Sequence, residues 1–468
     1  GATQQFLDFT HVQYKKHVGD EFGNTFLGFR GDEPDYGFVP WTPELPNEFM
    51  KQKGYDVRPW VASFMIKNPT DSMLRVKADY WNVWSDLFGK NFFKVQADWC
   101  ASNNLQYMVH LNHEDKMMWL ARSEGDFFED LRHVQIPGVD AIWNQIWPGK
   151  VSDYPKYASS VAHVYGHPRS MSESFAAYRP APNVDQAKWV VDYQFARGIN
   201  FFEWMYWPAS TRGDGSPHGW FADPKFPHVA QYSNRISYLL SNGTPAAKIA
   251  VYYPTDSEWL GDQQADSTAL KLSQSLLESQ HDFDFLDDHA VLHVLSPSSD
   301  GVRNLSGQVY QTILIPSVSA MPKEVLDKLK YFSKNGVKVV FTSQLPSLIA
   351  GKTYRNAGHS YDFSPMIQTH DQDYFQYLPT PDFKMANTSK AVKYNHRHFS
   401  DGDLYFIFNE GESPVNTKMT LGGKGEVERW NAVTGETRKI ESEQQGNSVQ
   451  LKMNLAPWET KVFVVSSH

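Results

Sequence analysis

Two glutamates in this 468-residue chain stand at the ends of apolar, strand-like segments. Glu33 follows "TFLGFRG" (residues 25–31), and Glu173 lies in "RSMSESF" (residues 169–175). Two carboxyl groups that flank a sugar are the minimal machinery of glycoside hydrolysis, since one protonates the leaving oxygen and the other acts on the anomeric carbon or on a water. A gap of about 5–5.5 Å permits direct attack with retention, and one of about 6.5–9.5 Å admits a water and gives inversion.

Polar neighbours surround both glutamates and could tune them. They are Arg30, Asp32, Asp35, Ser172 and Ser174. An ionised aspartate close by raises the pKa of a glutamate, as a general acid requires. We therefore predict Glu33 as the acid and Glu173 as the base or nucleophile. Either glutamate alone could equally be a hydrogen-bonded residue of a solvated turn.

The other strand-like segments also end in polar or aromatic residues, which we predict to bind the sugar. These residues are His110, Asn112, His113, Glu114, Trp143, Asn144, Gln145, Glu203 and Trp207. Amides, histidines and carboxylates hydrogen-bond hydroxyl groups, and tryptophans stack on sugar rings. Glu203 is a rival second carboxylate.

The segment "HLNHED" (residues 110–115) could instead hold a metal ion. Its spacing differs from HExxH, and positions i and i+3 of a strand face opposite sides, which disfavours zinc. Calcium stays open because it needs only oxygen ligands. The two-carboxylate mechanism itself requires no cofactor.

Strand-like segments alternate with helical ones through the first 240 residues. The predicted strands span residues 25–31, 105–112, 139–146, 169–175 and 199–207, and the predicted helical segments span residues 6–22, 47–103, 125–134, 153–164 and 185–197. This alternation is typical of a parallel sheet, and a (β/α) barrel with its site at the carboxyl ends of the strands fits best. A closed barrel has eight strands. We predict that the chain holds the last five and that a preceding segment supplies the rest, unless strands are hidden in residues 47–103.

The predicted α/β architecture has three domains. Residues 1–240 form the catalytic (β/α)-barrel portion, residues 245–360 an accessory flavodoxin-like α/β domain, and residues 385–468 an antiparallel β-sandwich. The last assignment follows from alternating apolar and polar residues between Gly, Asn and Asp turns.

Composition narrows the class of partner. The net charge of −9 argues against a nucleic-acid-binding surface, and no run approaches the 18 apolar residues of a membrane span. A single cysteine can form no intramolecular disulfide. The 15 Trp, 23 Tyr and 30 Phe suit an oligosaccharide or polysaccharide substrate.

Four segments together resemble a known family. "GFRGDEPDYGFVPWTPELPNEFMKQKGYDVRPW", "GVDAIWNQIW", "HPRSMSESFAAY" and "ARGINFFEWMYWP" are similar to bacterial, Bacteroides-type glycoside hydrolases of the family 106 α-L-rhamnosidase kind, and more loosely to β-galactosidase-like (β/α)8 barrels. "FDFLDDHAV" and "APWETKVFVV" resemble the accessory layer and terminal sandwich of such enzymes. The chain departs from the pattern at its front, where the first barrel strands are absent.

The resemblance implies an exo-acting, periplasmic or secreted glycosidase, although no signal peptide is visible. On the rhamnosidase branch it would be inverting and calcium-assisted, with Glu33 matching the acid and Glu173 the base. On the β-galactosidase-like branch the same two residues would match the acid/base and nucleophile of a retaining enzyme. The alternatives are a non-catalytic glycan-binding protein on a degenerate barrel and a zinc hydrolase that uses "HLNHED".

Overall fold

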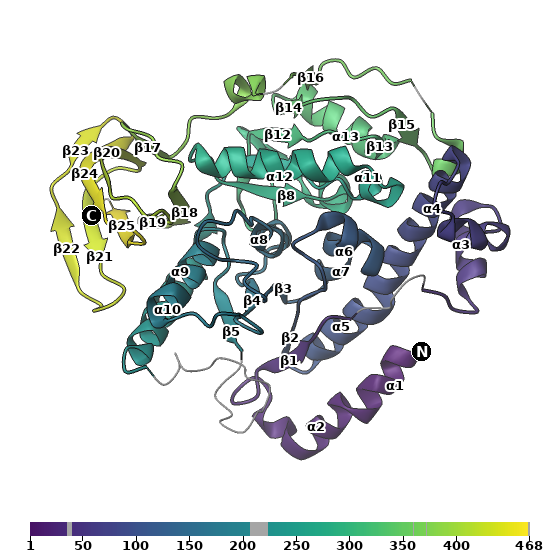
Figure 1. Ribbon diagram of the computed structural model, residues 1–468, viewed down its shortest axis with the longest axis horizontal. Helices are drawn as coiled ribbons and strands as arrows, with labels where there is room; N and C mark the ends of the chain where they lie inside the picture. The colour runs from purple at the N-terminus through teal and green to yellow at the C-terminus, as the bar shows by residue number, and fades with distance from the viewer. Residues whose placement is uncertain (35–39, 206–222, 359, 371, 467–468) are drawn as a thin grey trace.

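The computed structural model describes residues 1–34, 40–205, 223–358, 360–370 and 372–466 (Figure 1). Its first sheet is curled and has five parallel strands in the order β1-β2-β3-β4-β5. They are β1 (Gly28–Gly31), β2 (Gln106–Val109), β3 (Ile136–Ala141), β4 (Met171–Ser174) and β5 (Phe201–Trp204). Strand order thus equals chain order, as expected of successive βαβ units.

Helices connect and cover these strands. They are α1 (Ala2–Phe9), α2 (His11–Val18), η1 (Gly19–Glu21), α3 (Leu45–Lys53), η2 (Arg58–Met65), α4 (Asp71–Phe88), the π-helix η3 (Gly89–Phe93), α5 (Lys94–Ser102), α6 (Met117–Ser123), α7 (Phe127–Leu131), α8 (Pro155–Tyr165), α9 (Val184–Phe195) and α10 (Phe226–Leu240). Residues 47–103 contain helices and loops but no strand in the described structure. The single helix predicted for residues 6–22 is wrong: Thr10 leaves the helical region, and α1 and α2 meet there.

All five predicted strands of this sheet are present, but the third lies earlier than predicted. It spans Ile136–Ala141 rather than residues 139–146. Trp143 (φ 50°) and Asn144 (φ 54°) take left-handed backbone conformations that end the strand, although the apolar residues around them look strand-like. The residues after the strand therefore form a turn.

The second sheet has the order β16-β14-β12-β7-β8, with all pairs parallel. Numbered along the chain, this is the 2-1-3-4-5 order of flavodoxin-like sheets. Its strands are β7 (Ile249–Tyr252), β8 (Phe283–Leu286), β12 (Thr312–Ile315), β14 (Lys338–Phe341) and β16 (Ile367–Gln368). The accompanying elements are α11 (Thr255–Leu260), α12 (Gln263–Glu278), η5 (Ala290–Val294), α13 (Lys323–Lys334), η6 (Tyr354–Asn356), η7 (Asp373–Tyr377), and the short strands β9 (Ser296–Ser298), β10 (Gly301–Arg303), β11 (Val309–Tyr310), β13 (Ala320–Pro322) and β15 (Leu348–Ala350).

Two antiparallel sheets form the C-terminal end of the molecule, at the left of Figure 1. Their orders are β17-β20-β24-β23 and β22-β21-β25-β19-β18-β6. The strands are β6 (Thr244–Pro245), β17 (Phe383–Met385), β18 (Val392–Phe399), β19 (Gly402–Asn409), β20 (Val415–Gly422), β21 (Glu426–Trp430), β22 (Thr437–Ile440), β23 (Glu443–Gln445), β24 (Ser448–Leu455) and β25 (Thr460–Ser466). The three-domain division and its boundaries stay predictions.

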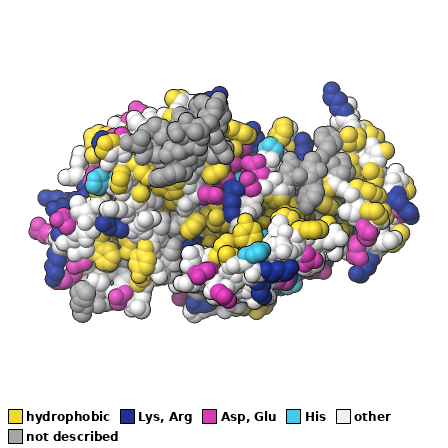
Figure 2. Space-filling view, turned by 90° about the horizontal axis from the view of Figure 1, so that it is seen from below, with side chains coloured by type: hydrophobic (Ala, Val, Ile, Leu, Met, Phe, Trp, Pro, Cys, Tyr) yellow, Lys and Arg dark blue, Asp and Glu magenta, His cyan; other side chains and the backbone are white. Residues whose placement is uncertain are grey.

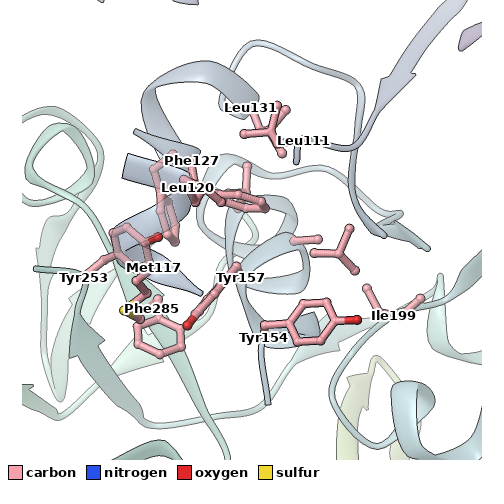
Figure 3. Close-up of a cluster of buried hydrophobic side chains, with 14 of the residues drawn as sticks. Leu111, Met117, Leu120, Phe127, Leu131, Tyr154, Tyr157, Ile199, Tyr253 and Phe285 are labelled. Carbon is pink, nitrogen blue, oxygen red and sulfur yellow. The ribbon is translucent and has the colours of Figure 1, made fainter. Parts of the chain in front are cut away.

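The first two sheets are joined through α8. Tyr157 on α8 packs its ring 5.3 Å from that of Tyr253 and 5.0 Å from that of Phe285, within a larger aromatic and aliphatic cluster (Figure 3). Buried charges cross the same joint, because Lys156 Nζ lies 2.8 Å from Asp282 Oδ1 and 3.8 Å from Asp284 Oδ1. Within the described residues, no helix is both long and apolar enough to span a lipid bilayer.

Candidate active site

Three carboxylates lie side by side at the carboxyl ends of adjacent strands. Asp140 of β3 pairs in register with Glu173 of β4, and Glu173 pairs with Glu203 of β5. Residues in register on neighbouring strands point to the same face of a sheet, so the three side chains line one side of it. Glu203 was predicted as the rival of Glu173, and the two are neighbours.

Arg30 of β1 contacts two of these carboxylates, Glu173 and Glu203, and also Asp32. Its Nε lies 2.7 Å from Glu203 Oε2, its Nη1 lies 2.9 Å from Asp32 Oδ2, and its Nη2 donates to Glu173 Oε2. Burial disfavours the guanidinium charge, but Glu203, Glu173 and Asp32 outweigh it and raise the pKa of Arg30. One cation thus holds three acidic side chains together.

His110, which follows β2, is a second cation at the same point. Its Nε2 lies 3.0 Å from Glu173 Oε2 and 3.4 Å from Asp32 Oδ1. The ring is fully buried, which opposes protonation, yet hydrogen bonds to Asp32 and Glu173 raise the pKa of His110 well above 6.5. The hydrogen bond from His110 and the charge of Arg30 lower the pKa of Asp32 to about 2 despite its partial burial.

Asp140 is a member of this site that the sequence analysis missed. Burial, together with the charges of Glu114 and Glu173 and a hydrogen bond with Glu33, raises the pKa of Asp140 to about 10, although His110 acts in the opposite direction. At neutral pH Asp140 therefore holds a proton. Among the described residues its Oδ1 has no hydrogen-bond partner.

The two predicted catalytic glutamates meet around His110. Asp32, Glu33 and His110 place one polar atom each within 4.8 Å of one another, and so do His110, Asp140 and Glu173. Glu33 lies two residues beyond β1 with φ 38°, and Glu173 is 5% exposed in β4. The structure thus brings both glutamates to one cluster.

Three predicted sugar ligands bond instead to nearby backbone. Glu114 is buried, and its Oε1 accepts hydrogen bonds from Leu111 N (2.9 Å) and Asp140 N (3.2 Å); burial raises its pKa to about 8. Gln145 Oε1 accepts from Ile142 N, and Asn144 Oδ1 accepts from the backbone N of Arg179. These contacts favour a role in positioning the loops rather than in binding substrate.

The predicted tuning of Glu173 by its serine neighbours is wrong. Ser172 and Ser174 point to the opposite face, where their hydroxyls bond each other (3.0 Å) and Gln194 donates to Ser174. Adjacent residues of a strand face opposite sides, which excludes them from the carboxylate cluster.

The remaining predicted ligands lie apart or outside the described residues. The ring of His113 lies 5.7 Å from that of Trp119 at an interplanar angle of 58°, and in the part of the chain that is described His113 belongs to no cluster of metal-ligating groups. Asn112 is half-buried, and Trp143 is 63% exposed. Asp35 and Trp207 fall outside the described residues.

Backbone strain gathers where these strands end. The non-glycine residues with positive φ include Glu33 after β1, His113 after β2, Trp143 and Asn144 after β3, and Phe175 and Ala177 after β4. Left-handed conformations cost such residues about 1–2 kcal/mol each. They persist where surrounding structure imposes them, and they are common at functional sites.

The described residues do not by themselves fit the calcium ion that the resemblance implied. Both clusters of three potential ligands at this site include His110, whereas calcium prefers six to eight oxygen ligands. Arg30 and the protonated His110 already balance part of the acidic charge.

Figure 2 shows the molecule from below. On this face, acidic side chains gather next to a basic one, with hydrophobic surface beside them. A glycan site needs this combination of hydrogen-bonding groups and apolar surface.

The fold and the site define a class. A parallel sheet whose carboxyl edge gathers acidic side chains, an arginine and a histidine is typical of barrel-type glycosidases. Residues 2–444 match the alpha-L-rhamnosidase family, glycoside hydrolase family 106, and the chain belongs to this family.

A curated relative is distant in sequence and longer than this chain. A Formosa agariphila protein named "Putative beta-glucuronidase" is 22% identical over 484 residues, covering 96% of this chain and 39% of the relative. The chain therefore spans about two fifths of the length of the curated relative that it matches.

Solved structures share the fold. A rhamnosidase from Novosphingobium sp. PP1Y superposes with a TM-score of 0.80 at 20% identity, covering 100% of this chain and 47% of that one. A β-galactosidase from Bacillus circulans sp. alkalophilus gives 0.63 at 11% identity, covering 97% and 82%. Both branches of the predicted resemblance are thus represented among the structural neighbours.

Proposed function

We propose that this chain carries the catalytic centre of a glycoside hydrolase that removes a terminal, uncharged sugar, with an α-L-rhamnoside as the substrate. The observation that carries the proposal is the convergence of Asp140, Glu173 and Glu203 from adjacent strands on Arg30 and His110. Membership of the alpha-L-rhamnosidase family supports the choice of sugar.

Glu173 acts as the base. Arg30 and His110 both direct N–H groups at its Oε2 and stabilise a negative charge there. The second oxygen of the carboxylate can then take a proton from a water molecule. That water attacks the anomeric carbon, and the sugar leaves with inverted configuration.

Glu33 acts as the acid. It accepts a hydrogen bond from Asp140, which is protonated at neutral pH, so the two carboxyl groups hold one proton between them. The proton held on Asp140 passes through Glu33 to the glycosidic oxygen as the bond to the anomeric carbon breaks, so the aglycone leaves as a neutral alcohol and the Asp140–Glu33 pair is left without that proton. Asp140 positions Glu33.

An anionic sugar is disfavoured at this site. In the described part of the chain, Arg30 already pairs with three carboxylates, and His110 with two of them, so neither cation is free to bind the carboxylate of a uronic acid. The remaining acidic groups would repel it. We therefore expect an aryl rhamnoside to be cleaved and an aryl glucuronide to be left intact.

The test measures release of an aryl leaving group by the wild type and by Glu33→Gln and Glu173→Gln. We expect each variant to lose at least about a thousandfold in rate, equivalent to about 4 kcal/mol of transition-state stabilisation, with little change in melting temperature. Glu324→Gln, an exposed change of the same kind on α13, is the matched control. Variants that keep full activity, or lose stability in step with rate, would refute these roles.

A retaining mechanism is the second candidate, because β-galactosidases are among the structural neighbours. Proton NMR of the first sugar released separates the two: the opposite anomer indicates inversion, and the same anomer indicates that Glu173 is a nucleophile. If the wild type binds the sugar by calorimetry but releases no product, the chain is a glycan-binding protein.

A further inference from the structure

A second group of ligand-type side chains lies in the C-terminal sheets, on the hairpin of β18 and β19. His396 and His398 are two residues apart on β18, so both rings face the same side of the strand. Asp403 of β19 lies directly opposite His398 in the antiparallel register. The hairpin therefore presents two imidazoles and one carboxylate to a single point.

The atoms of this group converge closely. His396 Nε2 lies 2.9 Å from Asp403 Oδ1, and His398 Nδ1 hydrogen-bonds the same oxygen. One polar atom from each of the three residues lies within 4.8 Å of the other two. Four ligands at about 2.0–2.1 Å from a tetrahedral zinc ion lie about 3.3 Å from one another, so small side-chain shifts would open room for the ion.

A second carboxylate supports the buried histidine from behind. His396 Nδ1, the nitrogen that faces away from Asp403, lies 3.3 Å from Asp382 Oδ2. Lys248 in turn pairs with Asp382, and the ring of Tyr405 stacks on His396 with centroids 4.0 Å apart. Zinc-bound histidines typically donate their second N–H to a carboxylate in this way, which fixes the ring and its tautomer.

One side of the group is open to solvent. The side chain of His396 is 3% exposed, that of Asp403 16% and that of His398 50%. An ion could enter past His398, and a water molecule could complete the coordination on that side.

We propose that His396, His398 and Asp403 bind one Zn²⁺ ion, with water as the fourth ligand. The ion would cross-link β18 and β19. The contact between His396 and Asp382 would connect both strands to the segment that precedes β17. The alternative is a metal-free ion cluster in which protonated His396 bridges Asp382 and Asp403. The site involves none of the residues around His110 and does not depend on the proposed function.

Zinc binding by the chelator-treated full chain tests the proposal. Calorimetric titration with zinc chloride at pH 8 should give one equivalent more for the wild type than for His398→Ala. The difference counts only this site, so any zinc bound at the cluster around His110 cancels. The exposed His293 offers the matched control, and His293→Ala should bind as many equivalents as the wild type.

Two further variants guard against an unfolded protein. Asp382→Asn leaves all three ligands in place and should weaken the affinity about 10–100-fold, the usual effect of losing a supporting carboxylate. Cobalt(II) should give the visible absorption of tetrahedral coordination in the wild type and lose it in His398→Gln. Equal zinc stoichiometry and affinity in the wild type and His398→Ala, or no binding by the wild type, would overturn the proposal.

Discussion

The two five-stranded parallel sheets of this chain differ in what they bury. Strands β7, β12 and β14 read "IAVY", "TILI" and "KVVF", and nearly all of their side chains are buried and apolar. Strand β4, "MSES", is just as buried but carries Glu173 and two serines. The second sheet gains stability from apolar burial, whereas the first buries charge that must be balanced locally.

Two buried aspartates make the contrast sharper. Asp284 of β8 is buried but paired with His163, Lys156 and Gln308, which lower its pKa to about 2. Asp140 of β3 has a protonated carboxyl with a pKa of about 10. Burying a carboxyl group without partners for its charge costs free energy, so the acidic cluster of the first sheet lowers the stability of the fold.

Backbone strain also differs between the two sheets. Left-handed non-glycine residues occur after β1, β2, β3 and β4, whereas among the described residues none follows β7, β8, β12 or β14 directly. Strain and buried charge thus coincide in the first sheet, which is the expected signature of a functional edge.

The largest effect should come from Arg30→Gln. Without this cation Asp32, Glu173 and Glu203 repel one another, so we expect the rate of aryl-rhamnoside hydrolysis to fall by at least about a thousandfold, or about 4 kcal/mol. Initial rates at saturating substrate measure it. Arg303→Gln, a change of an exposed residue in β10, should keep the wild-type rate. Wild-type activity in Arg30→Gln would show that the acidic cluster of the first sheet does not need this cation.

The converse change is Leu314→Ala in β12, where the side chain is fully buried. We expect the free energy of unfolding to fall by about 2–5 kcal/mol, because a cavity replaces packed methyl groups, while the rate per folded molecule stays the same. Urea unfolding and active-site titration measure the two quantities. Leu305→Ala, at a 63% exposed position, should change stability by no more than about 0.5 kcal/mol.

Asp140→Asn should change how stability depends on pH. In the unfolded chain the carboxyl of Asp140 ionises near pH 4, whereas in the folded chain its pKa is about 10. Between these values the folded protein alone holds the proton, so wild-type stability falls as pH rises. The melting temperature of Asp140→Asn should gain on that of the wild type by a few degrees from pH 5 to pH 9. Parallel curves would contradict the raised pKa.

The smallest effect should come from Trp143→Asn. Asparagine tolerates the left-handed backbone at φ 50° better than tryptophan does, so stability should rise by up to about 1 kcal/mol. If the exposed indole stacks on the sugar, KM should rise several-fold in the same variant. A rise in KM without a loss of stability shows that the strain serves binding; an unchanged KM would remove Trp143 from the site.

The sequence predicted the strands of the first sheet, the parallel second sheet and the C-terminal antiparallel sheets, because hydrophobic periodicity and turn residues report on these directly. It misplaced β3, since a left-handed turn at Trp143 leaves no mark on periodicity. The wrong role for Ser172 and Ser174 was avoidable, because alternation along a strand already puts them on the face opposite Glu173.

Within the site, the sequence identified Glu33, Glu173, Arg30, Asp32, His110 and Glu203 as candidates, and the structure brings them together. Their roles stay predictions. Asp140 was missed, although an isolated acidic residue inside the apolar run "GVDAI" was a usable signal. Glu114 and Gln145 could not be assigned from sequence, because nothing in it shows that their side chains return to the backbone.

The charges that cross the joint at α8 limit how this protein can be rebuilt. Lys156 and His163 on α8 pair with Asp282, which precedes β8, and with the fully buried Asp284 in β8. A chimera that joined the first sheet and its helices to an unrelated second sheet would leave Lys156 on one side, and Asp282 and Asp284 on the other, without their partners. An engineered exchange would therefore have to move α8 and β8 together, or replace these polar side chains with apolar ones in a single step.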